Sequence, residues 1–139
     1  MVRRRSAQVA SAQEEAERQR EIAASAIHEA PFECRLQTPQ GAAEFQAFNI
    51  SAAQLGQDGG VIVGRNPPQG GVLIADGAIS RQHLNMSVIG EELFVVDLDS
   101  ENGTFVNGQS VVGRSPQRVA DGDLLKVGPI EFEVTIRPV

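Results

Sequence analysis

Several residue types are scarce in this sequence, and their scarcity narrows the choice of fold and function. There is no tryptophan and no tyrosine, all six aromatic residues are phenylalanine, and Cys34 is the single cysteine. One cysteine excludes an internal disulfide framework and suits a reducing compartment, and so few aromatic residues predict a largely aliphatic core. No apolar run approaches the roughly 18 residues of a membrane span, and the N-terminus lacks the apolar core of a signal peptide. We therefore expect a cytoplasmic chain with no segment inserted in a membrane.

Positive charge is also scarce in most of the chain. Residues 1–30 hold five arginines and five glutamates, whereas residues 31–139 hold seven basic and thirteen acidic residues, a net charge of −6. This balance argues against nucleic acid as a partner, because such binding draws on many cationic contacts to phosphates. Two well-placed arginines can still hold one phosphate. Eleven of the twelve basic residues are arginine, which together with the abundant alanine suggests a bacterial, GC-rich source.

Residues 1–30 differ in composition from the rest of the chain. Between Ala7 and Ala30 there is no glycine, proline or aromatic residue, and the residues that dominate there favour helices. Two interpretations stay open for this arm. It is either a solvated linker with a marginal helix, or a cytosolic segment that follows a transmembrane helix of a longer parent, with Arg3-Arg4-Arg5 as the positive-inside flank. We assign residues 1–30 to a helical or disordered arm and residues 31–139 to a folded domain.

The folded part shows the short, alternating pattern of β-strands. Alternation is clearest from Phe32 to Leu36 and from His83 to Ile89, and glycine-containing turns such as Asn107-Gly108 separate the apolar runs. Strands do not alternate with helical segments, so the pattern of a parallel α/β sheet is missing. About ten short strands at regular spacing predict an all-β sandwich of two sheets.

A set of polar and glycine residues follows several of these apolar runs, where loops leave the strands. The set comprises Gly64-Arg65, Ser80-Arg81-Gln82-His83, Ser100-Glu101-Asn102-Gly103 and Asn107-Gly108. It offers two guanidinium groups, a hydroxyl and a carboxamide, which suit the binding of an anion. It offers no nucleophile beside a general base and no second histidine or cysteine to share a metal. The set therefore predicts a binding site, not an enzyme, and implies no metal or cofactor.

In order and spacing, these motifs resemble the forkhead-associated (FHA) domain over roughly residues 31–139. The resemblance implies a sandwich of about ten to eleven short strands in two sheets, which binds phosphothreonine peptides through loops at one end. It implies that Arg65 and Arg81 contact the phosphate and that Ser80 donates its hydroxyl to a phosphate oxygen. It also implies that Asn102 hydrogen-bonds the peptide backbone. The structural residues of the motif would be Gly64, His83 and Gly103.

Glu101 departs from the family pattern, in which its position often holds threonine or another small polar residue. A carboxylate at this position either repels the phosphate or selects a basic residue of the ligand, and both alternatives stay open. Glu101 is therefore a candidate peptide contact. Thr38, which we expect in a turn, is a candidate self-ligand.

Two functions follow from these observations. The first is a phosphothreonine-binding interaction module in Ser/Thr kinase signalling, whose partner is a Thr-phosphorylated protein, a kinase or a kinase substrate. The second is a phosphate-independent assembly or scaffold module, such as the cytosolic part of a membrane-anchored or secretion-associated protein. The acidic body and Glu101 favour the second function. Loss of binding after phosphatase treatment would separate the two.

Overall fold

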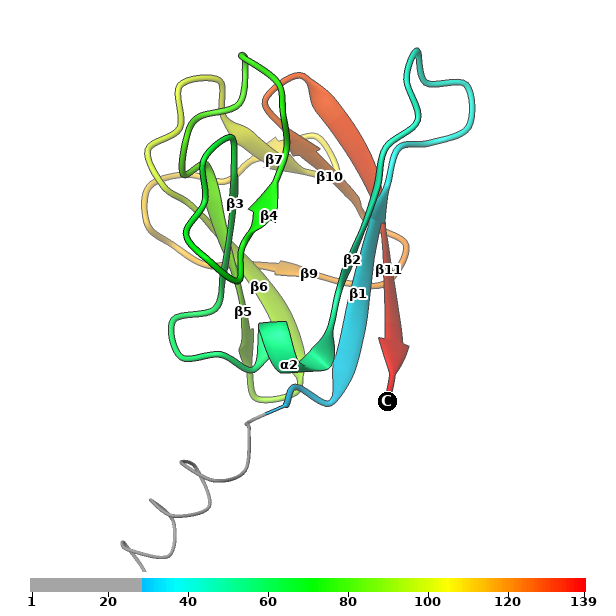
Figure 1. Ribbon diagram of the computed structural model, residues 1–139, viewed down its shortest axis with the longest axis vertical. Helices are drawn as coiled ribbons and strands as arrows, with labels where there is room; N and C mark the ends of the chain where they lie inside the picture. The colour runs from blue at the N-terminus through cyan, green and yellow to red at the C-terminus, as the bar shows by residue number, and fades with distance from the viewer. Residues whose placement is uncertain (1–28) are drawn as a thin grey trace, which may run out of the picture.

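Short alternating segments bury their apolar side chains by pairing into sheets that pack against each other. The computed structural model describes residues 29–139, and these residues form a sandwich of eleven strands (Figure 1). The strands are β1 (Phe32–Gln37), β2 (Ala47–Ile50), β3 (Val61–Gly64), β4 (Val72–Leu73), β5 (Leu84–Ile89), β6 (Glu92–Asp97), β7 (Thr104–Val106), β8 (Gln109–Ser110), β9 (Gln117–Val119), β10 (Leu124–Val127) and β11 (Ile130–Pro138). The short helix α2 (Ala52–Leu55) lies between β2 and β3.

The strands divide between two sheets. One sheet has six strands in the order β2-β1-β11-β10-β7-β8, and the other has five in the order β4-β3-β5-β6-β9. Neighbouring strands are antiparallel except for β3 and β4, which are parallel. The register between β1 and β11 runs from Phe32 opposite Pro138 to Gln37 opposite Glu133. This architecture confirms the expected all-β sandwich of two sheets.

Alternation along each strand decides which side chains enter the core. In β1, Phe32, Cys34 and Leu36 are buried, whereas Glu33 is exposed and Arg35 is partly exposed. Only two phenylalanines belong to the buried core, which is otherwise mainly valine, leucine and isoleucine. Each fully buried aliphatic side chain contributes about 1.5–3 kcal/mol relative to an exposed one. The core is therefore aliphatic, as the composition predicts.

Three short elements escape sequence analysis. Helix α2 begins with a capping box, in which the Ser51 hydroxyl accepts the Gln54 N–H at 3.1 Å and the Gln54 side chain accepts the Ser51 N–H at 3.0 Å. Strand β8 has two residues, both exposed, and β9 is exposed at two of its three positions. Such strands leave no alternation to detect.

Thr38 is not a self-ligand, and that expectation is wrong. The residue is 3% exposed, and its hydroxyl accepts the N–H of Gln46 at 2.9 Å and donates to the carbonyl oxygen of Gln46 at 3.3 Å. A side chain held in this way is inaccessible to a kinase.

The expected arm of residues 1–30 lies outside the described residues except for its last two. The boundary between an arm and a domain at residue 31 therefore stays a prediction. Within residues 29–139 the helical content is the four residues of α2, and nothing there has the length and apolarity of a membrane-crossing helix.

Candidate functional site

The end of β3 is joined to the loop that precedes β5. The N–H groups of Arg65 and Asn66 donate to the carbonyl oxygens of Ser80 at 2.9 Å and Arg81 at 3.0 Å. Gly64 makes this approach possible, because a Cβ atom there would overlap the carbonyl oxygen of Arg81. The glycine therefore sets Arg65 directly beside Ser80. In Figure 1 these loops lie at the end of the sandwich opposite α2 and the C-terminus.

The guanidinium group of Arg65 is anchored on one side and open on the other. Its Nε donates to the carbonyl oxygen of Ile79 at 3.0 Å, while the side chain as a whole is exposed. Among the described residues, its two terminal nitrogens have neither a hydrogen bond nor an ion pair. The neighbouring Arg81 is also exposed and makes no side-chain hydrogen bond within residues 29–139. Two cationic groups on adjacent segments are thus available to an anion.

The half-buried Ser80 offers a hydroxyl whose proton is not used within residues 29–139. Its Oγ accepts the N–H of Glu101 at 3.0 Å, so the hydroxyl proton is free to be donated elsewhere. The side chain of Glu101 is exposed. The loop between β6 and β7 therefore touches the loop between β4 and β5 at the residue that offers the hydroxyl.

A second bond joins the same two loops through Asn102. Its Nδ2 donates to the carbonyl oxygen of Ala78 at 2.8 Å, although the residue is exposed. This bond fixes the plane of the carboxamide and leaves Oδ1 and one N–H available. A fixed carboxamide can accept from and donate to the backbone of an extended peptide.

His83 is fully buried beneath these loops and links them. Its Nδ1 accepts the N–H of Ser80 at 3.0 Å, and its Nε2 lies 2.8 Å from the carbonyl oxygen of Gly103. These partners assign the proton to Nε2. Gly103 has φ +86°, a conformation that favours glycine, and its carbonyl oxygen also accepts the N–H of Gly128 at 2.9 Å. Both ring nitrogens of His83 are thus occupied by backbone groups of the site.

The β6–β7 loop is shaped by Asp97, which sequence analysis missed. Its Oδ1 accepts the hydroxyls of Ser100 at 2.6 Å and Thr104 at 2.7 Å, and its Oδ2 accepts the Ser100 N–H at 3.0 Å. Burial by itself raises the pKa of the Asp97 carboxyl, but the hydrogen bonds from Ser100 and Thr104 outweigh burial and hold this pKa below its ordinary value. The Asp-x-x-Ser spacing was the available signal, since Asp side chains often bond the backbone of a following turn.

The residues of the sequence motif thus meet at one end of the fold. Arg65, Ser80 and Asn102 lie on three loops that are tied together by hydrogen bonds, and Arg81 and Glu101 are exposed beside them. The preformed arrangement presents cations, a hydroxyl and a carboxamide on one surface. Such a surface can bind an anionic group carried on an extended chain.

Comparison with known proteins adds an independent finding. Residues 61–128 match the family model of the FHA domain, and no curated protein matches the chain. A domain solved in an analysis of phosphothreonine-dependent FHA domain interactions is 28% identical, with a TM-score of 0.58, and the match covers 77% of this chain and 99% of that one. The FHA domain of FhaA, complexed with the intracellular domain of Rv3910, is 29% identical, with a TM-score of 0.53 and coverages of 73% and 98%. The N-terminal FHA domain of S. cerevisiae Rad53p, in complex with a phosphothreonine peptide, is 26% identical, with a TM-score of 0.55 and coverages of 75% and 93%.

Proposed function

This chain belongs to the FHA domain family, and from that premise we propose that its folded part is a phosphothreonine-peptide-binding interaction module. The observation that carries the proposal is the anchored guanidinium of Arg65 beside the free hydroxyl proton of Ser80. A similar domain solved in complex with a phosphothreonine peptide supports the assignment.

The chemistry of the ligand matches the groups of the site. A phosphothreonine carries a charge of about −1.5 to −2 at neutral pH and three strong acceptor oxygens. The open edge of Arg65 can engage two of these oxygens, and the hydroxyl of Ser80 can donate to the third. Arg81 adds a second cation, which offsets the desolvation of a dianion. Because the loops are already bonded to one another, little conformational entropy is lost when the ligand binds.

Recognition of the peptide itself falls to the β6–β7 loop. Asn102 reads the backbone next to the phosphothreonine, which leaves the side chains of the ligand free to vary. Glu101 contacts a flanking residue of the peptide. Gly64, His83 and Gly103 act on the ligand only through the loop geometry that they maintain.

The partner in this proposal is a protein phosphorylated on threonine by a Ser/Thr kinase, or the kinase itself, in the cytoplasm. The module performs no chemistry on its ligand and signals by bringing the phosphorylated protein to whatever else the chain binds. We expect phosphothreonine to be preferred over phosphoserine, because the resemblance to the FHA family implies a pocket for the γ-methyl group.

The test is a fluorescence-anisotropy titration with a degenerate phosphothreonine peptide library and its unphosphorylated twin. We expect binding of the phosphorylated library alone, and loss of binding in Arg65→Ala. Arg118→Ala is the matched control. Arg118 is an exposed arginine on β9 that pairs at 2.8 Å with Glu92, at the opposite end of β6 from the β6–β7 loop. Equal binding of both libraries would instead support a phosphate-independent assembly module.

A further inference from the structure

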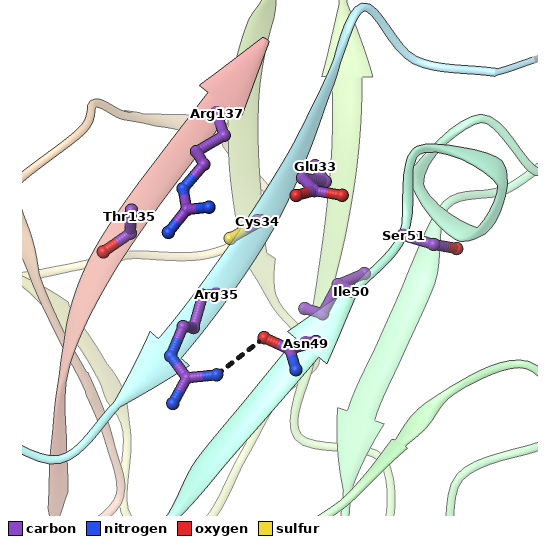
Figure 2. Close-up of a pocket in the computed structure, with 8 residues that line it drawn as sticks. All are labelled: Glu33, Cys34, Arg35, Asn49, Ile50, Ser51, Thr135 and Arg137. Carbon is purple, nitrogen blue, oxygen red and sulfur yellow. Dashed lines mark hydrogen bonds between the residues drawn. The ribbon is translucent and has the colours of Figure 1, made fainter. Parts of the chain in front are cut away.

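A polar hollow lies on the outer face of the six-stranded sheet, away from the loops of the candidate site (Figure 2). It has a volume of about 440 Å³ and spans the first half of β1, the end of β2 and the last residues of β11. Its polar lining residues are Glu33, Arg35, Asn49, Ser51, Thr135 and Arg137. None of them takes part in the binding of phosphothreonine proposed above.

Two arginines lie on this face at diagonal positions of neighbouring strands. Arg35 is opposite Thr135 in the register of β1 and β11, and Arg137 is opposite Glu33. Diagonal neighbours in a sheet are about 7–8 Å apart, within reach of long side chains. Figure 2 shows both guanidinium groups on the same side of the sheet, with the Thr135 hydroxyl beside the guanidinium group of Arg137. Together these side chains can surround one anionic group.

Hydrogen bonds orient Arg35 without neutralising it. Its Nε donates to the carboxamide oxygen of Gln37 at 2.9 Å, and one terminal nitrogen donates to the carboxamide oxygen of Asn49 at 2.9 Å. Between residues 29 and 139, neither Arg35 nor Arg137 forms an ion pair, although Glu33 lines the same hollow. Residues 31–139 hold only seven basic residues against thirteen acidic ones. Two arginines against the single carboxylate of Glu33 leave the hollow with a net positive charge, which favours an anionic partner.

We propose that this hollow binds the acidic run Glu14-Glu15-Ala16-Glu17 of the same chain. The run has three carboxylates within four residues and no cation between them. The described chain begins at Glu29 and reaches the hollow four residues later, at Glu33.

The connection is long enough for this contact. Twelve positions separate Glu17 from Glu29, and a chain spans at most about 3.3–3.6 Å per residue, or about 40 Å at full extension. A tether of this length keeps the run at an effective concentration of about millimolar near the hollow. The exposed Arg137 and the partly exposed Arg35 therefore suffice for a contact that free peptides would make only weakly.

The contact is electrostatic and leaves the phosphopeptide site open. Screening shortens the Debye length from about 8 Å at physiological ionic strength to about 3 Å at 1 M salt, so salt releases the run. The residues that line the hollow belong to the first half of β1, the end of β2 and the last residues of β11. In Figure 1 the start of β1 and the end of β11 lie on the side of the C-terminus. The proposed contact therefore lies against β1 and β11, at the far end from the loops that carry Arg65 and Ser80.

A spin label tests this contact on the full chain. Ala16→Cys introduces the labelling site, and Cys34 stays unlabelled because it is 2% exposed and burial raises the pKa of its thiol to about 12. We expect loss of the amide NMR signals of β1 and β11 around Arg35 and Arg137, and recovery of these signals in about 1 M salt. Loss confined to other elements, or no loss at low salt, would contradict the proposal.

Variants assign the effect to the arginines. The double variant Arg35→Gln/Arg137→Gln should restore the signals, whereas Arg118→Gln, on β9 of the other sheet, should not. If the double variant keeps the loss of signal, the hollow is not the site. Mixing the spin-labelled chain with an isotope-labelled chain should produce no loss in the latter, and a loss there would show binding between copies and overturn the assignment within one chain. Affinity for a phosphothreonine peptide should be unchanged in the double variant, so the two proposals fail independently.

Discussion

At the scale of single residues, the proposed site depends on a few groups whose positions are fixed by the backbone around them. Ser80 is the clearest case, because its carbonyl, N–H and Oγ each have a partner within the site. We expect Ser80→Ala to weaken binding of a phosphothreonine peptide by about 1.5–3 kcal/mol, the range for a hydrogen bond to a charged group. Calorimetry measures the loss, with Ser110→Ala on the exposed strand β8 as the control. Unchanged affinity would remove the hydroxyl from the site.

Gly64 acts by leaving room for a neighbouring backbone segment and not by contact with a ligand. A Cβ atom there would overlap the carbonyl oxygen of Arg81, whereas one at Gly77 would meet nothing within 4 Å. We expect Gly64→Ala to destabilise the fold by about 1–3 kcal/mol, the usual cost of overpacking, and to weaken phosphopeptide binding. Urea unfolding compares this variant with Gly77→Ala. Equal stability of the two variants would show that the close approach of β3 to Arg81 is dispensable.

At the scale of elements, the β6–β7 loop couples stability to pH through Asp97. The hydrogen bonds from Ser100 and Thr104 hold the pKa of Asp97 below its ordinary value of 3.8. A carboxyl with a lowered pKa in the folded state binds protons more readily when unfolded, so its stabilising contribution is complete above the ordinary value and is lost as pH falls through the folded-state pKa. We expect Asp97→Asn to be less stable than the parent chain at neutral pH, by about 1–3 kcal/mol for the bonds lost.

That difference should shrink as the solution becomes acidic. Unfolding curves collected from neutral pH down to strongly acidic pH measure the change for the parent chain, for Asp97→Asn and for Asp58→Asn, in which an exposed carboxylate is replaced. A constant difference between the parent chain and Asp97→Asn would mean that this carboxyl does not set the acid sensitivity of the loop.

Elements with a strong local signal were predictable from the sequence, and others were not. The Asn107-Gly108 turn has φ values of +49° and +84°, as a two-residue hairpin turn requires. Strands β1 and β5 form where apolar and polar residues alternate in the sequence. Strands β8 and β9 are short and mostly exposed, so the sequence shows no alternation of apolar and polar residues there. They are strands because they pair with β7 and β6. The motif identified the residues of the candidate site, but the diagonal placement of Arg35 and Arg137 follows only from the register of β1 with β11.

At the scale of the whole molecule, a cationic site sits on an acidic body. Residues 31–139 carry a net charge of −6, which repels acidic peptides and attracts basic ones over a distance set by screening. We expect a phosphothreonine peptide with lysines added beside its recognition sequence to associate faster than one with glutamates, and the gap to close with added salt. Stopped-flow fluorescence measures both rates. A salt-independent difference would point to direct contacts, such as one with Glu101, as its source.

The location of the bound phosphate tests the central claim most directly. A two-dimensional amide NMR titration compares a phosphothreonine peptide with its unphosphorylated form on the same labelled protein. We predict phosphate-dependent shifts centred on Arg65, Ser80 and Arg81 and extending to Asn102, with the amides of β1 and β11 unaffected. Shifts of equal size with the unphosphorylated peptide, or phosphate-dependent shifts centred on Arg35 and Arg137, would contradict the assignment of this end of the sandwich as the phosphothreonine site.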